Sequence, residues 1–131
     1  HNYRPGVMDR IGLGSDVLRE INPKLIYVAV SGFGTKGPMA DLPAFDHVIQ
    51  GLAGFTDLQA PDNNKFDFIR TFLCDKVTAY TVCQAATAAL LARATTSIGQ
   101  HIDISMLHSC LAFMRPDGMM HRTLTDDDTI E

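Results

Sequence analysis

One carboxylate of this sequence lies where a long helix is expected to begin. Asp75 starts a segment, residues 75–93, that is rich in Ala and Leu and contains neither Gly nor Pro. An acidic residue in a first turn satisfies free N–H groups and the helix dipole, so Asp75 fits the role of a helix cap. The same position keeps a carboxylate ionised at neutral pH, and an ionised carboxylate on rigid structure can act as a covalent nucleophile. The spacing alone favours the cap and leaves the nucleophile open.

A glycine-rich loop is the second candidate for chemistry. The segment Gly32-Phe33-Gly34-Thr35-Lys36-Gly37 fits the pattern G-x-G-x-x-G and follows a predicted strand. A dinucleotide site also requires a helix to begin there, whereas Pro38 and Pro43 follow and no helical period starts before Phe45. We therefore expect either a flexible loop or a loop that lets a bulky ligand approach the backbone closely.

The cysteines and histidines give weaker signals. Cys74 lies beside Lys76 and could be an activated thiol, but no His is close in sequence and a free Cys is usually a small buried hydrophobic residue. The cysteines are odd in number and far apart, which argues against a disulfide framework or a zinc knuckle; they are Cys74, Cys83 and Cys110. No metal site is expected, because metal-ligand spacing is absent from the histidines considered, which are His47, His101, His108 and His121.

The elements that must position these residues alternate between helix and strand. Helices are predicted at residues 16–21 (capped by Ser15), 45–52, 75–93 and 106–114, the last broken before Pro116. Strands are predicted at residues 25–30 and 101–105, and a long surface loop at residues 56–69. The first strand is continuously apolar, which predicts burial on both faces, and residues 77–93 carry almost no charge, which predicts a helix buried on most sides. This alternation is typical of an α/β fold.

Charge and hydropathy exclude two kinds of partner. The 131 residues carry 11 Lys+Arg against 15 Asp+Glu. Four of these acids lie in the final segment, residues 126–131, so the body of the chain is neutral and we expect neither nucleic acid nor an anionic membrane as a partner. The most apolar stretch, residues 77–92, is too short and too polar for a membrane span. With no signal region at the start and no disulfide pattern, the expected location is the cytoplasm.

Several short strings extend the pattern beyond single residues. They are Asn2-Tyr3-Arg4-Pro5-Gly6-Val7, then residues 22–27, 31–34 and 37–38, then Pro43-Ala44-Phe45-Asp46-His47-Val48-Ile49-Gln50, and finally Asp75 with residues 88–93 and 99–105. In this order and spacing they resemble the class III CoA transferase family, which includes formyl-CoA and carnitine CoA transferases and α-methylacyl-CoA racemases. The resemblance covers nearly the whole chain. Each string is weak alone, but their order is specific.

The resemblance implies a fold, an activity and an assembly. It implies an α/β fragment of a Rossmann-like, mostly parallel sheet layered with helices, in which residues 1–125 form part of the large catalytic domain and residues 126–131 an acidic end segment. The implied activity is transfer of coenzyme A between an acyl-CoA thioester and a carboxylic acid through a covalent aspartyl-CoA intermediate, without a permanently bound cofactor. Full-length members form interlocked homodimers and have further segments at both ends, so we expect this chain alone to have weak or no activity.

The resemblance also assigns roles to individual residues. The family nucleophile corresponds to Asp75, ahead of the Ala-Leu-rich helix. The residues that fall in the CoA-contacting loop are Asn2, Tyr3 and Arg10. The residues that fall in the loop lining the thioester end are Gly32, Phe33 and Gly34. A guanidinium at position 10 also suits a phosphate, because its fork of N–H donors matches phosphate oxygens.

Two alternatives remain beside the transferase. The racemases use a His and an Asp as proton-transfer groups, and their His directly precedes the Asp that corresponds to Asp46. Phe45 occupies that place here and cannot carry a proton, while His47 lies two residues on, about 200° around a helix. This favours a transferase over a racemase. The other alternative is an inactive truncated chain that only packs with a partner or binds CoA.

Overall fold

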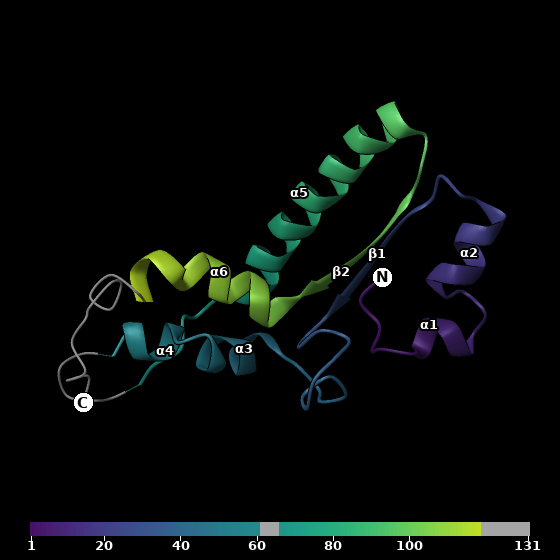
Figure 1. Ribbon diagram of the computed structural model, residues 1–131. Coiled ribbons are helices and arrows are strands. Elements are labelled where there is room, and N and C mark those ends of the chain that lie inside the picture. The colour runs from purple at the N-terminus through teal and green to yellow at the C-terminus, as the bar shows by residue number, and fades with distance from the viewer. Residues whose placement is uncertain (61–65, 119–131) are drawn as a thin grey trace, which may run out of the picture.

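The computed structural model describes residues 1–60 and 66–118 (Figure 1). Its helices are α1 (Val7–Arg10), α2 (Ser15–Ile21), α3 (Asp46–Leu52), α4 (Phe55–Leu58), α5 (Leu73–Thr96) and α6 (Met106–Gly118). Its strands are β1 (Ile26–Ser31) and β2 (Gln100–Ser105). The mixed α/β fold is therefore as predicted. The predicted domain boundary at residue 125, the acidic end segment and His121 lie outside the described residues.

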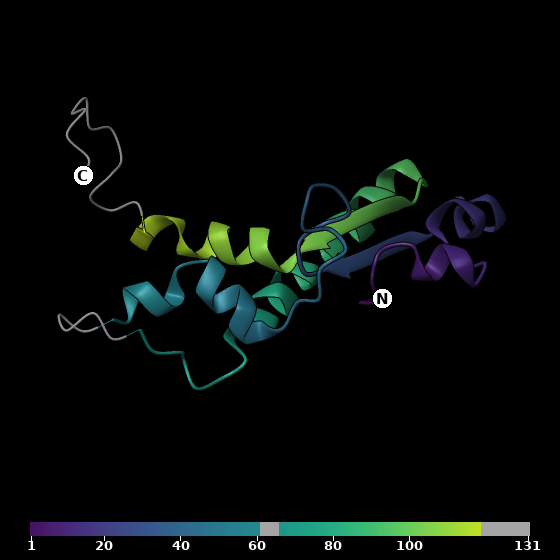
Figure 2. The same cartoon turned by 90° about the horizontal axis from the view of Figure 1, so that it is seen from below.

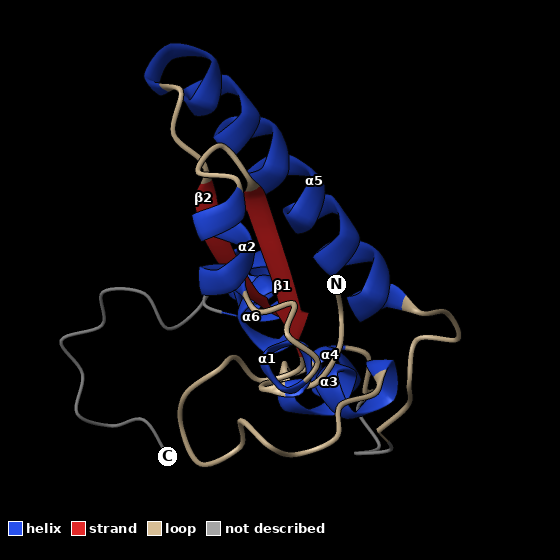
Figure 3. Cartoon of the chain, turned by 90° about the vertical axis from the view of Figure 1, so that its right-hand side faces the viewer, coloured by secondary structure: helices blue, strands red, loops and turns tan. Residues whose placement is uncertain are grey.

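The two strands form a parallel pair that holds the centre of the structure. Their register runs from Ile26 opposite Gln100 to Ser31 opposite Ser105. Parallel strands need a crossover connection, and α5 is the part of this connection that leads back to the start of β2. It packs along both strands (Figure 3). Figure 1 shows α5 on one side of the pair and α1 and α2 on the other.

The start of the chain pairs with the other edge of β1. The ammonium group of His1 donates to the Val28 carbonyl at 2.9 Å, and the His1 carbonyl accepts the Val30 N–H at 2.9 Å. Residues 2–5 therefore leave the sheet near the carboxyl end of β1, where the glycine-rich loop also begins.

The hydrophobic core lies at the end of the molecule opposite α1 and α2, where α3, α4 and α6 gather (Figure 2). Its buried members are Phe33, Ile49, Ala53, Phe55, Cys74, Val77, Cys110 and Met114. They come from these three helices, from the turn between α3 and α4, from the start of α5 and from the loop after β1. The core thus anchors the first turns of α5, including the turn that contains Asp75.

Two predictions of burial are wrong. In β1 only Tyr27 is buried and the other residues are half-buried. In α5 four residues are buried, whereas Tyr80 and Leu91 are 75% and 72% exposed. The reason is that, among the described residues, β1 has one neighbouring strand in the sheet and α5 packs on other elements with one side.

A search of the described residues for a membrane-spanning helix found none of sufficient length and hydropathy.

Several predicted element ends also differ. The helix α4 overlaps the start of the predicted loop at 56–69 and follows Gly54, whose φ of 90° favours glycine. The helix α6 continues through Pro116 to Gly118, so the predicted break before the proline is wrong; the proline removes one backbone hydrogen bond without ending the helix. Ser15 is the first residue of α2 and not its cap, which is Gly14. The helix α5 begins two residues before Asp75 and ends at Thr96, followed by the C-cap residue Ser97 with a φ of 59°.

We expect Gly99 to be essential for the approach of β2 to the segment before β1. A Cβ atom at this position would lie 2.0 Å from the Leu25 carbonyl oxygen. The Gly99 N–H donates to the Pro23 carbonyl at 2.8 Å, so the backbone cannot move away without losing this bond. Gly99→Ala should lower the free energy of unfolding by about 1–3 kcal/mol, the usual cost of overpacking, as measured by urea unfolding.

Gly51→Ala is the matched control for this substitution. No atom lies within 4 Å of the Cβ it would add to α3. Higher helix propensity should then stabilise the chain by roughly 0.5–1 kcal/mol. Equal effects of the two substitutions would contradict the close approach at Gly99.

Candidate active site

Asp75 lines a cavity of about 570 Å³, called here the Asp75 cavity. It is lined by the N-terminal loop, the carboxyl end of β1, the segment before α3 and the start of α5. Of the residues predicted to form the site, the cavity brings together Asn2, Tyr3, Gly32 and Asp75. The Asp75 side chain belongs to the third residue of α5 and is exposed, so it is accessible to a molecule in the cavity.

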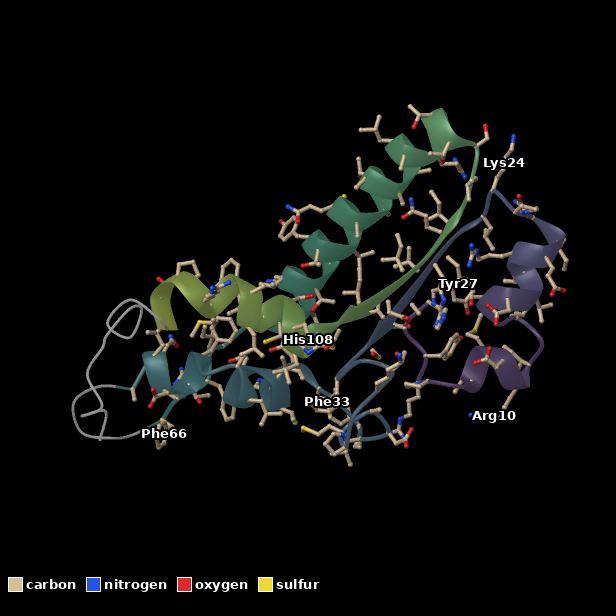
Figure 4. All side chains as sticks on the ribbon, in the orientation of Figure 1. Arg10, Lys24, Tyr27, Phe33, Phe66 and His108 are labelled. Carbon is tan, nitrogen blue, oxygen red and sulfur yellow. The ribbon has the colours of Figure 1, made fainter. Side chains whose placement is uncertain are left out.

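Three other predicted site residues do not line this cavity. Arg10 is exposed on α1, near the N-terminal end of the molecule, whereas Phe33 lies in the loop after β1 (Figure 4). Phe33 is buried in the core with Ile49 and Phe55. Gly34 has a φ of 92°, and its N–H donates to the Ser31 hydroxyl at 3.0 Å.

The glycine-rich loop serves a close contact within the chain. A Cβ at Gly32 would lie 2.1 Å from the Ala44 Cβ, so glycine allows the segment before α3 to fold against the end of β1. No helix begins between Gly32 and Phe45, which agrees with the prediction that this is not a dinucleotide-binding loop.

Two polar residues of α3 were not predicted as site residues. Their side chains form hydrogen bonds with the backbone at the start of α5 and just before it. Asp46 is 4% exposed, and its Oδ2 accepts the backbone N–H of Asp75 at 2.9 Å. Its Oδ1 accepts a hydrogen bond from the side-chain amide of Gln50, which is fully buried. The spacing of Asp46 and Gln50, four residues apart on a predicted helix, was the available signal.

The Gln50 side chain fixes the segment that leads into α5. Its Nε2 donates to the carbonyls of Thr71 at 3.0 Å and Ile69 at 3.3 Å. Its Oε1 accepts the Ile69 N–H at 2.9 Å. The amide therefore binds residues 69–71 through both its N–H and its oxygen atoms. These bonds determine where the first turn of α5 starts.

Asp75 lies in the first turn of α5, as predicted, but the prediction that its side chain caps the helix is wrong. Because α5 begins at Leu73, the N-cap residue is Phe72, and the described residues contain no side-chain hydrogen bond from this cap position. One of the free N–H groups of the first turn, that of Asp75, is satisfied by Asp46 from α3. The carboxylate of Asp75 is thus not occupied by capping.

The surroundings of Asp75 raise its pKa, against the expectation from helix position alone. The largest cause is loss of water around the carboxyl, and the second is the negative charge of Asp46. Both effects disfavour the ionised form. The Asp75 carboxylate is therefore a stronger base than an ordinary aspartate.

The hypothesis of an activated thiol at Cys74 is wrong. The thiol is fully buried, and its pKa is raised by burial, by contact with the Cys110 thiol and by the charges of Asp46 and Asp75. The Lys76 ammonium group donates to the Thr71 hydroxyl at 2.8 Å. Cys74 is a small core residue, as the alternative reading of the sequence predicted.

Phe45 and His47 both line the Asp75 cavity, although a rotation of about 200° was expected to separate them. The expectation fails because Phe45 precedes α3 and has an extended backbone, with φ −131° and ψ 157°. The His47 ring makes edge-on contacts with Phe68 and Phe72, at centroid distances of 5.3 and 6.3 Å. Within residues 1–60 and 66–118, no group of three or more His, Cys, Asp or Glu side chains is placed to hold a metal ion.

Comparison with known proteins gives a consistent answer along the chain. An acetyl-CoA:oxalate CoA-transferase from Acetobacter aceti is 41% identical over 87% of this chain and 30% of its own length. A succinate–glutarate CoA-transferase from Agrobacterium fabrum is 33% identical over 81% of this chain and 26% of its own length. The chain thus spans about 30% of the length of the curated relatives it matches.

Solved structures agree with these sequence relatives. The crystal structure of a CAIB/BAIF family protein from Brucella suis has a TM-score of 0.87 and 33% identity, and the match covers 92% of this chain and 32% of that one. A hypothetical protein from Mycobacterium tuberculosis has a TM-score of 0.84 and 32% identity, covering 92% of this chain and 35% of that one. The sequence profile described as CoA-transferase family III matches residues 1–131. The chain therefore belongs to CoA-transferase family III.

Proposed function

We propose that this chain is the part of a CoA transferase that supplies the nucleophile, Asp75. The main support is that Asp75, exposed at the start of α5, lines one cavity with Asn2, Tyr3 and Gly32. Family membership and the names of the relatives support transfer of CoA between carboxylic acids. The substrates are an acyl-CoA thioester and a carboxylic acid, and the reaction needs no permanently bound cofactor.

The proposed reaction proceeds through covalent bonds to Asp75. Its carboxylate oxygen attacks the thioester carbonyl carbon; the C–S bond breaks, and CoA leaves as a thiolate from a mixed anhydride. The thiolate attacks the aspartyl carbonyl, which releases the donor acid as a carboxylate and leaves an aspartyl-CoA thioester. The acceptor carboxylate reverses both steps and leaves as the new acyl-CoA. Each step forms one bond and breaks one, and no proton is gained or lost overall.

The remaining assignments belong to the same proposal. Arg10, exposed on α1, suits a CoA phosphate outside the Asp75 cavity, because a guanidinium binds phosphate with a fork of N–H donors. Phe33 and Gly34 would act through the shape of the loop after β1. The whole protein would be an interlocked homodimer in the cytoplasm.

The first prediction of this proposal is a covalent CoA adduct. The natural protein that contains this sequence is incubated with a mixture of acyl-CoA thioesters and its intact mass is measured. We expect a CoA-sized mass increase on the peptide that contains Asp75, absent in Asp75→Asn. Asp57→Asn, an exposed carboxylate of α4, is the matched control and should retain the adduct.

Three results would count against this prediction. Absence of an adduct across a broad acyl panel contradicts the covalent mechanism, and an adduct that persists in Asp75→Asn contradicts the choice of nucleophile. A natural chain of 131 residues that stays unmodified supports the inactive alternative. Complete turnover by the 131-residue chain alone would refute our expectation that it has weak or no activity.

The pH dependence of stability shows whether the Asp75 carboxylate destabilises the folded chain or stabilises it as a helix cap would. A carboxyl whose pKa is higher in the folded chain makes stability fall as pH rises from the ordinary carboxyl pKa through the raised one. Asp75→Asn cannot ionise, so the difference in unfolding free energy should move in favour of the variant between about pH 3 and pH 7. A cap would give the opposite sign, a loss of up to about 1 kcal/mol at neutral pH. Urea unfolding over this pH range distinguishes the two.

A second candidate function, α-methylacyl-CoA racemisation, is favoured by the position of His47 in the same cavity as Asp75. That reaction needs two groups that exchange a proton at the α-carbon, and Phe45 cannot be one of them. A racemase would introduce solvent deuterium at the α-carbon of a branched acyl-CoA without forming a CoA adduct. We expect no deuterium incorporation, and incorporation that is lost in His47→Ala would favour the racemase.

A further inference from the structure

Asp46 and Gln50 form a buried polar pair whose described side-chain hydrogen bonds, apart from the one between them, all go to the approach and first turn of α5. Both side chains are more than nine-tenths buried. A buried polar group destabilises a protein unless it is hydrogen-bonded, so the pair and the backbone it binds are held together strongly. The bonded backbone groups belong to Ile69, Thr71 and Asp75.

The hydrogen bond to Asp75 joins α3 directly to the proposed nucleophile. Free N–H groups in the first turn of a helix usually bond to water or to a cap within the same segment. Here the N–H of Asp75 itself donates to the Asp46 carboxylate, 29 residues earlier in the chain. A displacement of Asp46 therefore displaces the backbone that holds the Asp75 carboxylate.

The charge of Asp46 acts on the same carboxylate. The other ionisable groups around the start of α5 lie in the cavity lining, in the segment before α5 and in the core. They are Tyr3, Arg4 and His47 of the lining, Arg70 and Lys76 beside Thr71, and the buried thiols of Cys74 and Cys110. After loss of water, the cause that raises the pKa of Asp75 is the negative charge of Asp46. Asp46 thus influences both the place and the basicity of Asp75.

We infer that Asp46 and Gln50 are positioning residues for the nucleophile: Gln50 fixes the approach to α5, and Asp46 fixes the Asp75 peptide and places a negative charge beside its side chain. This inference rests on the proposed function of Asp75 for its catalytic consequence. Neither residue touches the reacting atoms. Together they hold Asp75 in the lining of the cavity, and the charge of Asp46 makes its carboxylate more basic.

The test separates charge from geometry with two substitutions at one position, made in the natural protein. Asp46→Asn removes the charge, whereas Asp46→Glu keeps the charge and changes the reach of the side chain. Both should slow adduct formation at neutral pH by about 10- to 100-fold, as a misplaced catalytic group does. Only Asp46→Asn should shift the acid limb of the pH–rate profile to lower pH, because it removes the charge that raises the pKa of Asp75.

Gln50→Leu tests the other half of the pair. It removes the amide bridge to residues 69–71 and the bond to Asp46 Oδ1 but keeps the Asp46 carboxyl, so it should slow adduct formation and shift the acid limb less than Asp46→Asn does. The matched controls are Asp57→Asn for the charge and Gln84→Leu for the amide, both at exposed positions. Neither control should change the rate or the acid limb.

Two direct measurements keep the inference testable without an adduct, and the first of them needs no variant. In the unsubstituted protein, hydrogen exchange of the Asp75 amide should be slow, because its N–H is bonded to a buried carboxylate. NMR titration of the Asp75 carboxyl should give a raised pKa that falls in Asp46→Asn. Fast exchange of the Asp75 amide, or an unchanged pKa in a folded Asp46→Asn, would overturn the inference. A slow amide and a shifted pKa in a protein that forms no adduct would support the positioning pair and refute the proposed function.

Discussion

The hydrogen bond from the Asp75 peptide to the buried Asp46 carboxylate is the interaction on which the site depends. It joins the first residue of α3 to the third residue of α5 across 29 residues of chain. Gln50 adds three hydrogen bonds to the backbone of Ile69 and Thr71, so the turn before α5 is held by the same helix. Because the starts of both helices line the Asp75 cavity, this linkage sets the cavity wall and the direction of Asp75 together.

The hydrophobic core makes the linkage rigid. Cys74, next to Asp75, is fully buried and contacts the thiol of Cys110 on α6, and Ile49 lies beside Gln50 in the sequence of α3 and is also fully buried. The buried polar pair and the apolar core therefore occupy the same short stretches of helix. A shift of Asp75 would break hydrogen bonds on one side and core packing on the other, which is why a residue exposed to the cavity can still be held in one place.

The predictions that held are those that local sequence determines. The strand at residues 101–105 and the helices at 16–21 and 45–52 match β2, α2 and α3 to within a residue at each end, because apolar periodicity and helix-breaking residues act over a few positions. Burial of α5 was predicted wrongly, since composition reports which surroundings a helix tolerates and not which ones this chain supplies. The break predicted before Pro116 was also wrong, because a proline removes one backbone hydrogen bond and can leave the helix to continue past it.

The candidate site divides in the same way. The position of Asp75 ahead of an Ala-Leu-rich helix, together with the ordered family strings, identified the candidate nucleophile and the N-terminal loop that shares its cavity. The roles of Asp46 and Gln50 could not be predicted, because their partners lie 19 to 29 residues away and only the folded chain brings them together. The separation of Phe45 from His47 failed because helix geometry was applied to a residue that precedes the helix.

The arrangement around Asp75 lowers the stability of the folded chain. Two carboxylates near the start of one helix repel each other, and the Asp75 carboxyl loses water as well, so its ionised form costs folding free energy that a neutral side chain would not. The same two effects make the carboxylate more basic, which favours the proposed attack on a thioester carbon. A helix designed for stability alone would place one carboxylate at this terminus and turn it to the free N–H groups. Here the buried Asp46 accepts the Asp75 N–H, so the Asp75 carboxylate is left available for the proposed reaction.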